Sequence, residues 1–331
     1  MHKLSFSQVW NYDNLFLAWQ RVKENHGCAG VDGVSIEKFE ARLKRNLLNI
    51  QTELQNRNYQ PLPLLKFLVD KGNGEARPLA VPTVKDRITQ SAVLELIEPI
   101  FEAEFEECSF AYRKGRSVKQ AVYQIQEYRD KGYKWVVDAD IDDYFNDINH
   151  ELLLERVKEL IEDEDVLRLI EMWVKAEVYD GESVFRLEKG IPQGSVISPI
   201  LANLFLDSLD EELMGKGYKL VRYGDDFLIL CKKEDEAVEA VEITDDILEN
   251  LSLDLNEEKT AVVDFDQGFK YLGVLFVRSL IMVPFERKKK ERRVLYMPPP
   301  LDIGAYLRSR GQGNRTRITR MKRINTDKKD Q

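Results

Sequence analysis

The spacing of apolar residues along the chain predicts helices that alternate with short strands. Residues 8–60 place apolar side chains three and four positions apart, as at Phe39, Leu43 and Leu47, which indicates helices around a loop at 30–33. Prolines and glycines interrupt the apolar runs of 61–82, which predicts an extended ribbon with its tip at 70–74. Further helices are predicted at 84–105, 118–129, 150–176, 198–213 and 236–251, and strands at 134–137, 184–187, 261–265 and 271–276. Antiparallel strands mixed with helices indicate an α+β fold.

An acidic pair lies between two of these apolar runs. Gly224, Asp225 and Asp226 separate residues 219–221 from 227–230, which predicts a β-hairpin that presents both carboxylates at its turn. Adjacent carboxylates repel each other, and a divalent cation such as Mg²⁺ relieves that repulsion. Taken alone, an ordinary Asp-rich turn is the simpler interpretation. The metal-site interpretation therefore requires another carboxylate elsewhere in the chain.

A second acidic cluster follows the strand predicted at 134–137. Its members are Asp138, Asp140, Asp142, Asp143 and Asp147. Apolar residues alternate with these acids, so part of the segment must be buried, and at least one carboxylate is expected to face a site rather than solvent. A solvated surface loop is the alternative. Two acidic clusters at strand ends resemble the palm of a nucleic-acid polymerase, in which carboxylates hold two Mg²⁺ ions.

Composition limits the class of protein. The chain has 331 residues, of which 43% are hydrophobic, enough for a globular protein with a sizeable core. Its three cysteines show neither zinc-ligand spacing nor a disulfide framework, which favours a reducing compartment. The N-terminus lacks the apolar core of a signal peptide, and no apolar run approaches the roughly 18 residues of a membrane helix. We expect a soluble, cytoplasmic protein with no membrane partner.

Charge is distributed unevenly along the chain. The net charge is −9, yet residues 285–331 contain 15 Lys and Arg against 5 Asp and Glu. A basic C-terminal segment on an acidic body suggests binding to a polyanion near that end. For residues 312–331 a solvated tail is an equally good interpretation.

Several motifs occur in the order found in reverse transcriptases of the group II intron lineage, which this chain resembles. The segment 30–35 is similar to the N-terminal extension of that lineage, 77–90 to its fingers motif, and 109–117 to the next motif, with Tyr112 and Lys114 in place of the usual Phe and Pro. The palm motifs A, B, C and D correspond to 139–145, 190–199, 223–226 and 255–260, and the primer grip to 268–273. Gly224 stands where this lineage more often has Ala. The resemblance covers residues 30–276.

The resemblance implies a right-hand polymerase fold with fingers and palm, an antiparallel palm sheet backed by helices, and a short or atypical thumb region. Residues 1–130 would form the N-terminal extension and fingers. Residues 131–283 would form the palm with the catalytic hairpin and primer grip, and 284–331 a basic C-terminal segment that is a reduced thumb or a tail.

The resemblance also implies roles for particular residues. Asp140, Asp225 and Asp226 would be catalytic and would bind two Mg²⁺ ions, with the Ile141 carbonyl as a further ligand and Mn²⁺ as a substitute. Lys259 would be a general acid for the departing pyrophosphate. Nucleotide contacts would come from Arg77, Lys71, Phe145, Gln193 and Gly194. Without the motifs, the three cations are ordinary surface residues and 193–194 a plain turn. His150 is predicted to cap the helix that follows it, with no catalytic role.

The register of motif A decides the predicted product. In the family a bulky ring five residues after the first metal-binding Asp excludes a ribose 2′ hydroxyl, and Phe145 follows Asp140 by that spacing. Asp138 and Asp143 also have that spacing, and viral RNA-copying polymerases place an Asp there. We favour the Asp140 frame, because its neighbours match the reverse transcriptase motif. This frame predicts preferential incorporation of dNTPs.

The predicted function is RNA-directed DNA polymerisation from an RNA template, a DNA or RNA primer and dNTPs. Only 55 residues follow Phe276, and 287–300 reads as a basic strand ending in prolines rather than a helical thumb, so splicing maturase activity is not expected. The best-fitting branch is CRISPR-associated, in which the enzyme works with integrase subunits to acquire spacers from RNA. The alternatives are a defence-associated or other intron-like reverse transcriptase, or a non-catalytic, RNA-binding maturase-like protein.

Overall fold

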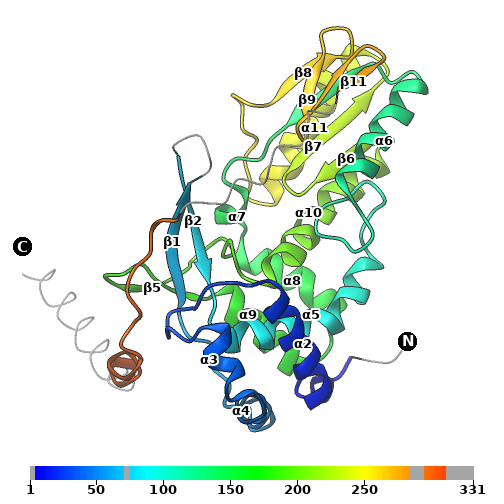
Figure 1. The fold of residues 1–331 in the computed structure, drawn as a ribbon. Coiled ribbons are helices and arrows are strands. Elements are labelled where there is room, and N and C mark those ends of the chain that lie inside the picture. The colour runs from blue at the N-terminus through cyan, green and yellow to red at the C-terminus, as the bar shows by residue number, and fades with distance from the viewer. Residues whose placement is uncertain (1–3, 71–74, 283–293, 311–331) are drawn as a thin grey trace, which may run out of the picture.

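A computed structural model describes residues 4–70, 75–282 and 294–310 of the chain (Figure 1). The helices of the N-terminal half are α1 (Phe6–Val9), α2 (Tyr12–Glu24), α3 (Ile36–Glu40), α4 (Leu43–Gln55), α5 (Val84–Glu102) and α6 (Val118–Asp130). Those that follow are α7 (Tyr144–Asp147), α8 (His150–Leu160), α9 (Glu164–Val174), α10 (Ser198–Gly215) and α11 (Glu234–Asn250). The predicted α+β class is confirmed.

Four antiparallel strands form the sheet that carries both acidic clusters. They are β3 (Trp135–Ala139), β6 (Lys219–Tyr223), β7 (Asp226–Cys231) and β8 (Ala261–Asp264), in the order β6-β7-β3-β8. The hairpin of β6 and β7 pairs Tyr223 with Asp226, and Ala139 at the end of β3 pairs with Phe227. This register brings the end of β3 beside the hairpin turn. We call this four-stranded sheet the palm sheet.

The two faces of the palm sheet are covered by different elements, as the alternation of side chains along a strand requires. Val137, Phe227 and Ile229 belong to the main hydrophobic core, which includes α10 and α11. Val136 and Leu228 face the other way, into a smaller core with α6 and a separate three-stranded sheet. That second sheet consists of β9 (Phe269–Tyr271), β10 (Val274–Val277) and β11 (Leu280–Met282). Both coverings are visible in Figure 1.

The ribbon predicted at 61–82 is the antiparallel hairpin of β1 (Leu64–Asp70) and β2 (Ala76–Val81). Strand β4 (Glu177–Tyr179) pairs in parallel with β1, and β5 (Val184–Arg186) pairs with β4. Figure 1 shows this fingers sheet and the palm sheet as two separate parts that stand on one helical base. Strands β4 and β5 lie in the sequence range predicted for the palm, yet they pair with the fingers hairpin.

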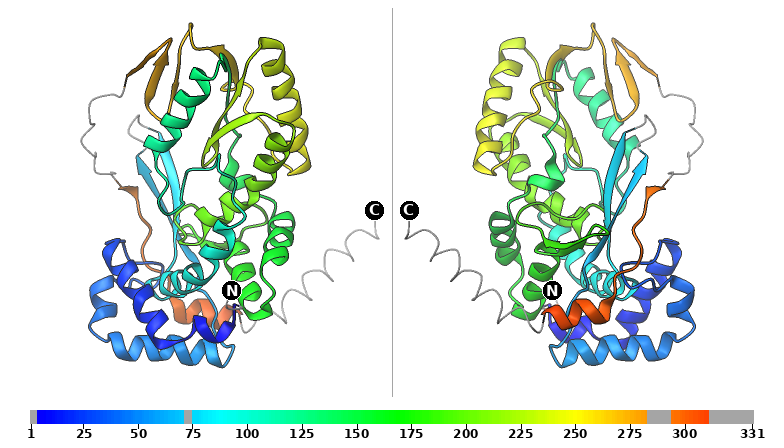
Figure 2. Two further views of the ribbon diagram at one scale, coloured as in Figure 1. Left: turned by 90° about the vertical axis from the view of Figure 1, so that its right-hand side faces the viewer. Right: turned by 90° about the vertical axis from the view of Figure 1, so that its left-hand side faces the viewer.

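The described part of the C-terminal segment lies against the fingers (Figure 2). Strand β12 (Val294–Tyr296) pairs with β1 in antiparallel fashion, and the Leu301 amide donates to the Val31 carbonyl at 2.9 Å. Residues 303–310 are helical, and Arg310 forms an ion pair with Glu177 at 3.2 Å. The predicted strand before the prolines is therefore present at 294–296. The basic residues 287–293 lie outside the described residues.

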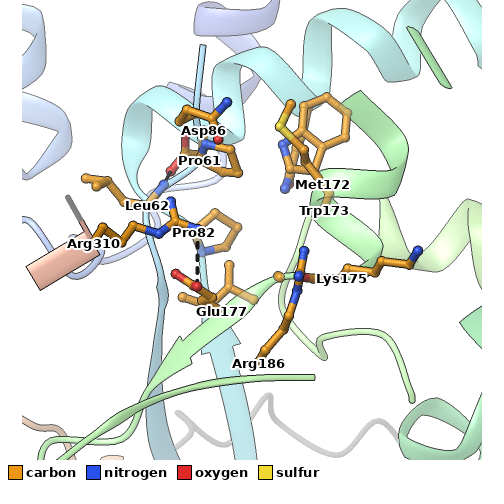
Figure 3. A pocket seen from close by; sticks show the side chains of 14 residues that line it. Pro61, Leu62, Pro82, Asp86, Met172, Trp173, Lys175, Glu177, Arg186 and Arg310 are labelled. Atoms are coloured by element: carbon orange, nitrogen blue, oxygen red, sulfur yellow. Dashed lines mark hydrogen bonds and ion pairs between the residues drawn. The ribbon is translucent and has the colours of Figure 1, made fainter. Parts of the chain in front are cut away.

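A cavity lies where this C-terminal segment meets the fingers (Figure 3). Its lining includes Asp86, Trp173, Glu177 and Arg310. The buried Asp86 carboxylate already accepts hydrogen bonds from the Tyr59 and Thr83 hydroxyls and the Leu62 amide. The described residues that line the cavity include none of the predicted catalytic residues, so this cavity is distinct from the acidic site.

Two local predictions were wrong. The strand predicted at 271–276 is a hairpin, because Leu272 and Gly273 both have positive φ angles, 50° and 80°, and reverse the chain between β9 and β10. The cap of α8 is Asn149, whose side chain accepts from the amides of residues 151 and 152. His150 is instead the first helical residue, and its ring Nε2 lies 2.6 Å from the Gly190 carbonyl oxygen.

Across the described ranges, no helix has the length and apolar character needed to cross a membrane.

Candidate active site

The predicted acidic hairpin is present, with Gly224 and Asp225 as the two turn residues between β6 and β7. Gly224 has a φ angle of 77°, the left-handed conformation that a two-residue turn of type II′ requires at its first position. Asp225 is half-buried, whereas Asp226 is exposed and begins β7. The two carboxylates therefore start from different backbone positions and are not equivalent.

The carboxylates of both acidic clusters influence one another. Although the Asp226 residue as a whole is exposed, the protein around its carboxylate removes part of its hydration. This desolvation, followed by the charges of Asp225 and Asp140, raises the pKa of Asp226 to about 6. Burial, followed by Asp226 and Asp140, raises the pKa of Asp138 to about 6 as well. The pKa of Asp225 is also raised, first by burial and then by Asp140. Several negative charges are thus held close together at the end of β3 and the hairpin turn.

This donor set fits hard divalent cations, which prefer carboxylate oxygens and relieve like-charge repulsion. In the parts of the chain that the structure describes, no three His, Cys, Asp or Glu side chains are already arranged around one metal position. The Lys259 ammonium instead lies 2.5 Å from the Asp140 carboxylate. Ile141, the predicted carbonyl ligand, is buried directly after Asp140 and bridges to Leu255.

A buried arginine anchors the hairpin turn from the side of α10. Arg222 donates from Nε to both carboxylate oxygens of Asp210, at 2.8 and 3.0 Å. From Nη1 it donates to Asn203 Oδ1 and to the Gly224 carbonyl, both at 3.1 Å. Arg222 and Asp210 are completely buried. Sequence reasoning missed this network, although a charge inside the apolar strand and another inside the apolar helix were visible signals.

The predicted nucleotide-contacting loop is held against the fingers. The Ala80 amide donates to the Gln193 carbonyl at 2.8 Å. Gly194 has a φ angle of 116°, and a Cβ added there would lie 3.0 Å from the Ala80 carbonyl oxygen, so a side chain at this position would be crowded by β2 and strained in its backbone. Gln90 of α5 also holds the loop, because its side-chain oxygen accepts hydrogen bonds from the Ser195 hydroxyl and the Val196 amide, both at 3.0 Å.

Phe145 contacts the same loop nearer its start. Its carbonyl accepts from the Ile191 amide at 2.7 Å, and its half-buried ring packs edge to face against Tyr144, with centroids 5.5 Å apart. A cavity whose lining includes Pro78, Asn146 and Gln193 lies beside it. The turn of motif A, the motif B loop and β2 thus meet at one place.

The predicted cations are distributed unevenly around the acids. Arg77 is exposed on β2, and its charge lowers the pKa of Asp225, opposing the larger effect of burial. The hydrogen bond to Asp140 raises the pKa of Lys259. Lys71 lies outside the described residues.

An antiparallel sheet that carries carboxylates at one end, with a separate fingers hairpin contacting the neighbouring loop, is the arrangement of a right-hand nucleic-acid polymerase. The family described as reverse transcriptase (RNA-dependent DNA polymerase) matches residues 69–276. The chain belongs to this reverse transcriptase family.

Individual proteins place the chain near group II intron-encoded enzymes. It is 33% identical over 289 residues to protein YkfC of Escherichia coli, a match that covers 76% of each chain. It is 25% identical to the group II intron-encoded protein LtrA of Lactococcus lactis, over 81% of this chain and 56% of LtrA. The predicted group II intron-like reverse transcriptase is thereby confirmed.

A solved structure supports the fold. A telomerase from Candida albicans, in a complex with telomeric RNA, aligns with a TM-score of 0.54 at 15% identity, over 68% of this chain and 47% of the telomerase. This likeness concerns the fold alone. The chain spans only about half the length of LtrA and of the telomerase.

Proposed function

We propose that the chain copies RNA into DNA with Asp140, Asp225 and Asp226 as the ligands of two divalent cations, Mg²⁺ or in its place Mn²⁺. The observation that carries this proposal is the register of β3 and β7, which sets Asp140 beside the Asp225–Asp226 turn. The bound cations would stabilise the negative charge on the attacking and leaving oxygens of an in-line displacement. The Ile141 carbonyl is proposed as a further oxygen ligand.

The chain's own residues would position the substrates. Arg77, together with Lys71, would pair with the triphosphate of the incoming dNTP, and Gln193 with Gly194 would line its binding site. The primer 3′ oxygen forms a bond to the α-phosphorus while the bond from that phosphorus to the pyrophosphate oxygen breaks. Lys259, which is protonated and next to Asp140, would donate a proton to the leaving pyrophosphate. The proton of the 3′ hydroxyl passes to solvent.

Phe145 is proposed to select dNTPs over rNTPs. The competing register of motif A starts at Asp138 and would put Asp143 at the selecting position. The side-chain oxygen of Asp143 accepts a hydrogen bond from the Asn146 side chain at 2.8 Å, which supports the register with Phe145 in that position. Replacing Phe145 by Val should raise rNTP incorporation relative to dNTP incorporation and leave dNTP turnover less affected. Equal use of both nucleotides by the wild type would remove this role.

Primer extension on an RNA template with dNTPs and Mg²⁺ tests the proposal. Asp225→Asn and Asp140→Asn should abolish product, whereas Asp246→Asn, an exposed control on α11, should extend like the wild type. If the wild type and Asp225→Asn both lack product while the chain still binds RNA, the non-catalytic, RNA-binding alternative replaces polymerisation. Intact acidic clusters favour catalysis, because like charges held close together are costly to maintain in a scaffold without catalytic function.

We further propose CRISPR spacer acquisition from RNA as the biological role, with integrase subunits as partners. Its support is the strand β12, which returns to the fingers where an intron-encoded enzyme is expected to continue into a helical thumb. Co-purification with a spacer integrase encoded beside the gene tests this role. A neighbouring defence gene of another kind, without an integrase, would favour a different intron-like reverse transcriptase.

A further inference from the structure

One buried hydroxyl connects the three-stranded sheet to the acidic hairpin. Tyr271, the last residue of β9, donates from its hydroxyl to the carbonyl oxygen of Asp226 at 3.0 Å and lies 3.2 Å from that of Val221. The two acceptors belong to β7 and β6. The contact therefore spans both strands of the hairpin within three residues of its turn.

The local fold fixes the position of this hydroxyl. The chain reverses directly after Tyr271, which pairs with Val274 across the two-residue turn. The neighbouring rings of Phe269 and Phe276 stack with centroids 5.1 Å apart, and all four residues belong to the smaller hydrophobic core. Only 3% of Tyr271 is exposed, so its ring has little freedom to withdraw the hydroxyl.

The hairpin turn is thus held from both faces of the palm sheet. Arg222 bonds the Gly224 carbonyl from the α10 side, and Tyr271 bonds the Asp226 carbonyl from the side of the three-stranded sheet. Asp226 begins a strand directly after the turn, where the ladder of backbone hydrogen bonds ends. A side-chain hydrogen bond at this carbonyl therefore restrains the backbone from which the carboxylate projects.

We propose that Tyr271 is a positioning residue of the polymerase, whose hydroxyl fixes the main chain of Asp226 and so the direction of its carboxylate. This inference rests on the proposed role of Asp226. It also couples the β9–β10 hairpin, the segment that resembles the primer grip, to the catalytic turn. Movement of that hairpin with the primer would be transmitted to the site through one hydrogen bond.

The test compares Tyr271→Phe with Tyr179→Phe. Tyr179 is likewise buried and donates its hydroxyl to a backbone carbonyl, that of Gly181 at 3.0 Å, but it lies in the fingers sheet. Both variants lose a buried hydroxyl that donates to backbone carbonyl oxygen. Tyr271→Phe should lower kcat about threefold to tenfold, with KM for dNTP nearly unchanged, and raise the Mg²⁺ concentration for half-maximal rate. Tyr179→Phe should keep the kcat and the Mg²⁺ dependence of the wild type.

Amide hydrogen exchange supplies a measurement that does not depend on activity. Peptides covering residues 222–228 should exchange faster in Tyr271→Phe than in the wild type, whereas Tyr179→Phe should leave them unchanged. Equal kcat, equal Mg²⁺ dependence and equal exchange at the hairpin in both variants would overturn the positioning role. If Asp226→Asn itself kept full activity, the proposed catalytic role of Asp226 would fail instead, so the two failures can be told apart.

Discussion

Arg222 and Asp210 form a completely buried ion pair, and the same guanidinium bonds the carbonyl of Gly224 in the turn that presents Asp225. Two charges removed from water require each other, because either one alone would be desolvated without compensation. The pair also explains how Arg222 of β6 and Asp210 of α10 can both be buried among apolar side chains. The position of the acidic turn thus depends on a contact between α10 and β6.

Asp210→Asn should therefore lower the free energy of unfolding by about 3–5 kcal/mol, the usual cost of breaking a buried pair. Urea denaturation at neutral pH measures this change. The exposed control Asp246→Asn should stay within about 0.5 kcal/mol of the wild type. The double variant Arg222→Met with Asp210→Leu should recover much of the stability without recovering polymerase activity. A single variant as stable as the control would contradict the importance of the pair.

Lys259→Ala should separate stability from catalysis. The side chain of Lys259 is 64% exposed, so its ion pair with Asp140 should contribute at most about 1 kcal/mol to folding. Loss of a general acid should nevertheless lower kcat by roughly 10²- to 10⁴-fold. Thermal melting and single-turnover extension measure the two effects. Lys233→Ala, another exposed lysine, is the control, and a kcat equal to this control would exclude Lys259 as the proton donor.

Gly194→Ala tests how closely the loop at 193–194, which is predicted to contact the nucleotide, approaches β2. The added Cβ would meet the Ala80 carbonyl at 3.0 Å in a backbone conformation with φ of 116°, so the loop must shift. Gly132→Ala is a matched control, since Gly132 has a φ of 90° with nothing within 4 Å of an added Cβ. Both variants incur backbone strain of about 1–3 kcal/mol. Only Gly194→Ala should raise KM for dNTP, and an equal KM in both would refute the predicted contact.

The acidic site should make stability depend on pH. Burial, followed by the charges of Asp225 and Asp140, raises the pKa of Asp226 from 3.8 to about 6. The folded protein therefore holds this proton more tightly than the unfolded chain does, and stability contributed by the protonated form is lost as pH rises from about 4 to about 6.

Asp226→Asn should consequently be more stable than the wild type at pH 7.5 in the absence of divalent cations, with the difference disappearing below pH 4. Urea denaturation between pH 4 and pH 7.5 measures this difference in the free energy of unfolding. Added Mg²⁺ should stabilise the wild type at pH 7.5 more than the variant. A variant that is less stable than the wild type at pH 7.5 would show that Asp226 is not electrostatically strained.

Most of the local elements, and the close approach of the two acidic clusters, could be predicted from the sequence. The apolar runs around Gly224 predicted the hairpin, and the motif order predicted that Asp140 would lie beside it. The proposed roles of Lys259, Gln193 and Phe145 come only from the resemblance, since each is an ordinary residue in its local pattern. The turn at 272–273 was missed because Leu272 continues an apolar run despite its positive φ angle, which left Gly273 as its one local signal.

The sequence by itself determined which stretches are helical or extended and where the acids lie along them, because the spacing of apolar residues acts between near neighbours. Only the tertiary structure decided which stretches meet. Asp210 and Arg222 are 12 residues apart, Tyr271 and Asp226 are 45 apart, and β12 pairs with a strand near the start of the chain. Such contacts depend on the packing of whole elements and on the few polar groups that each must satisfy once it is buried.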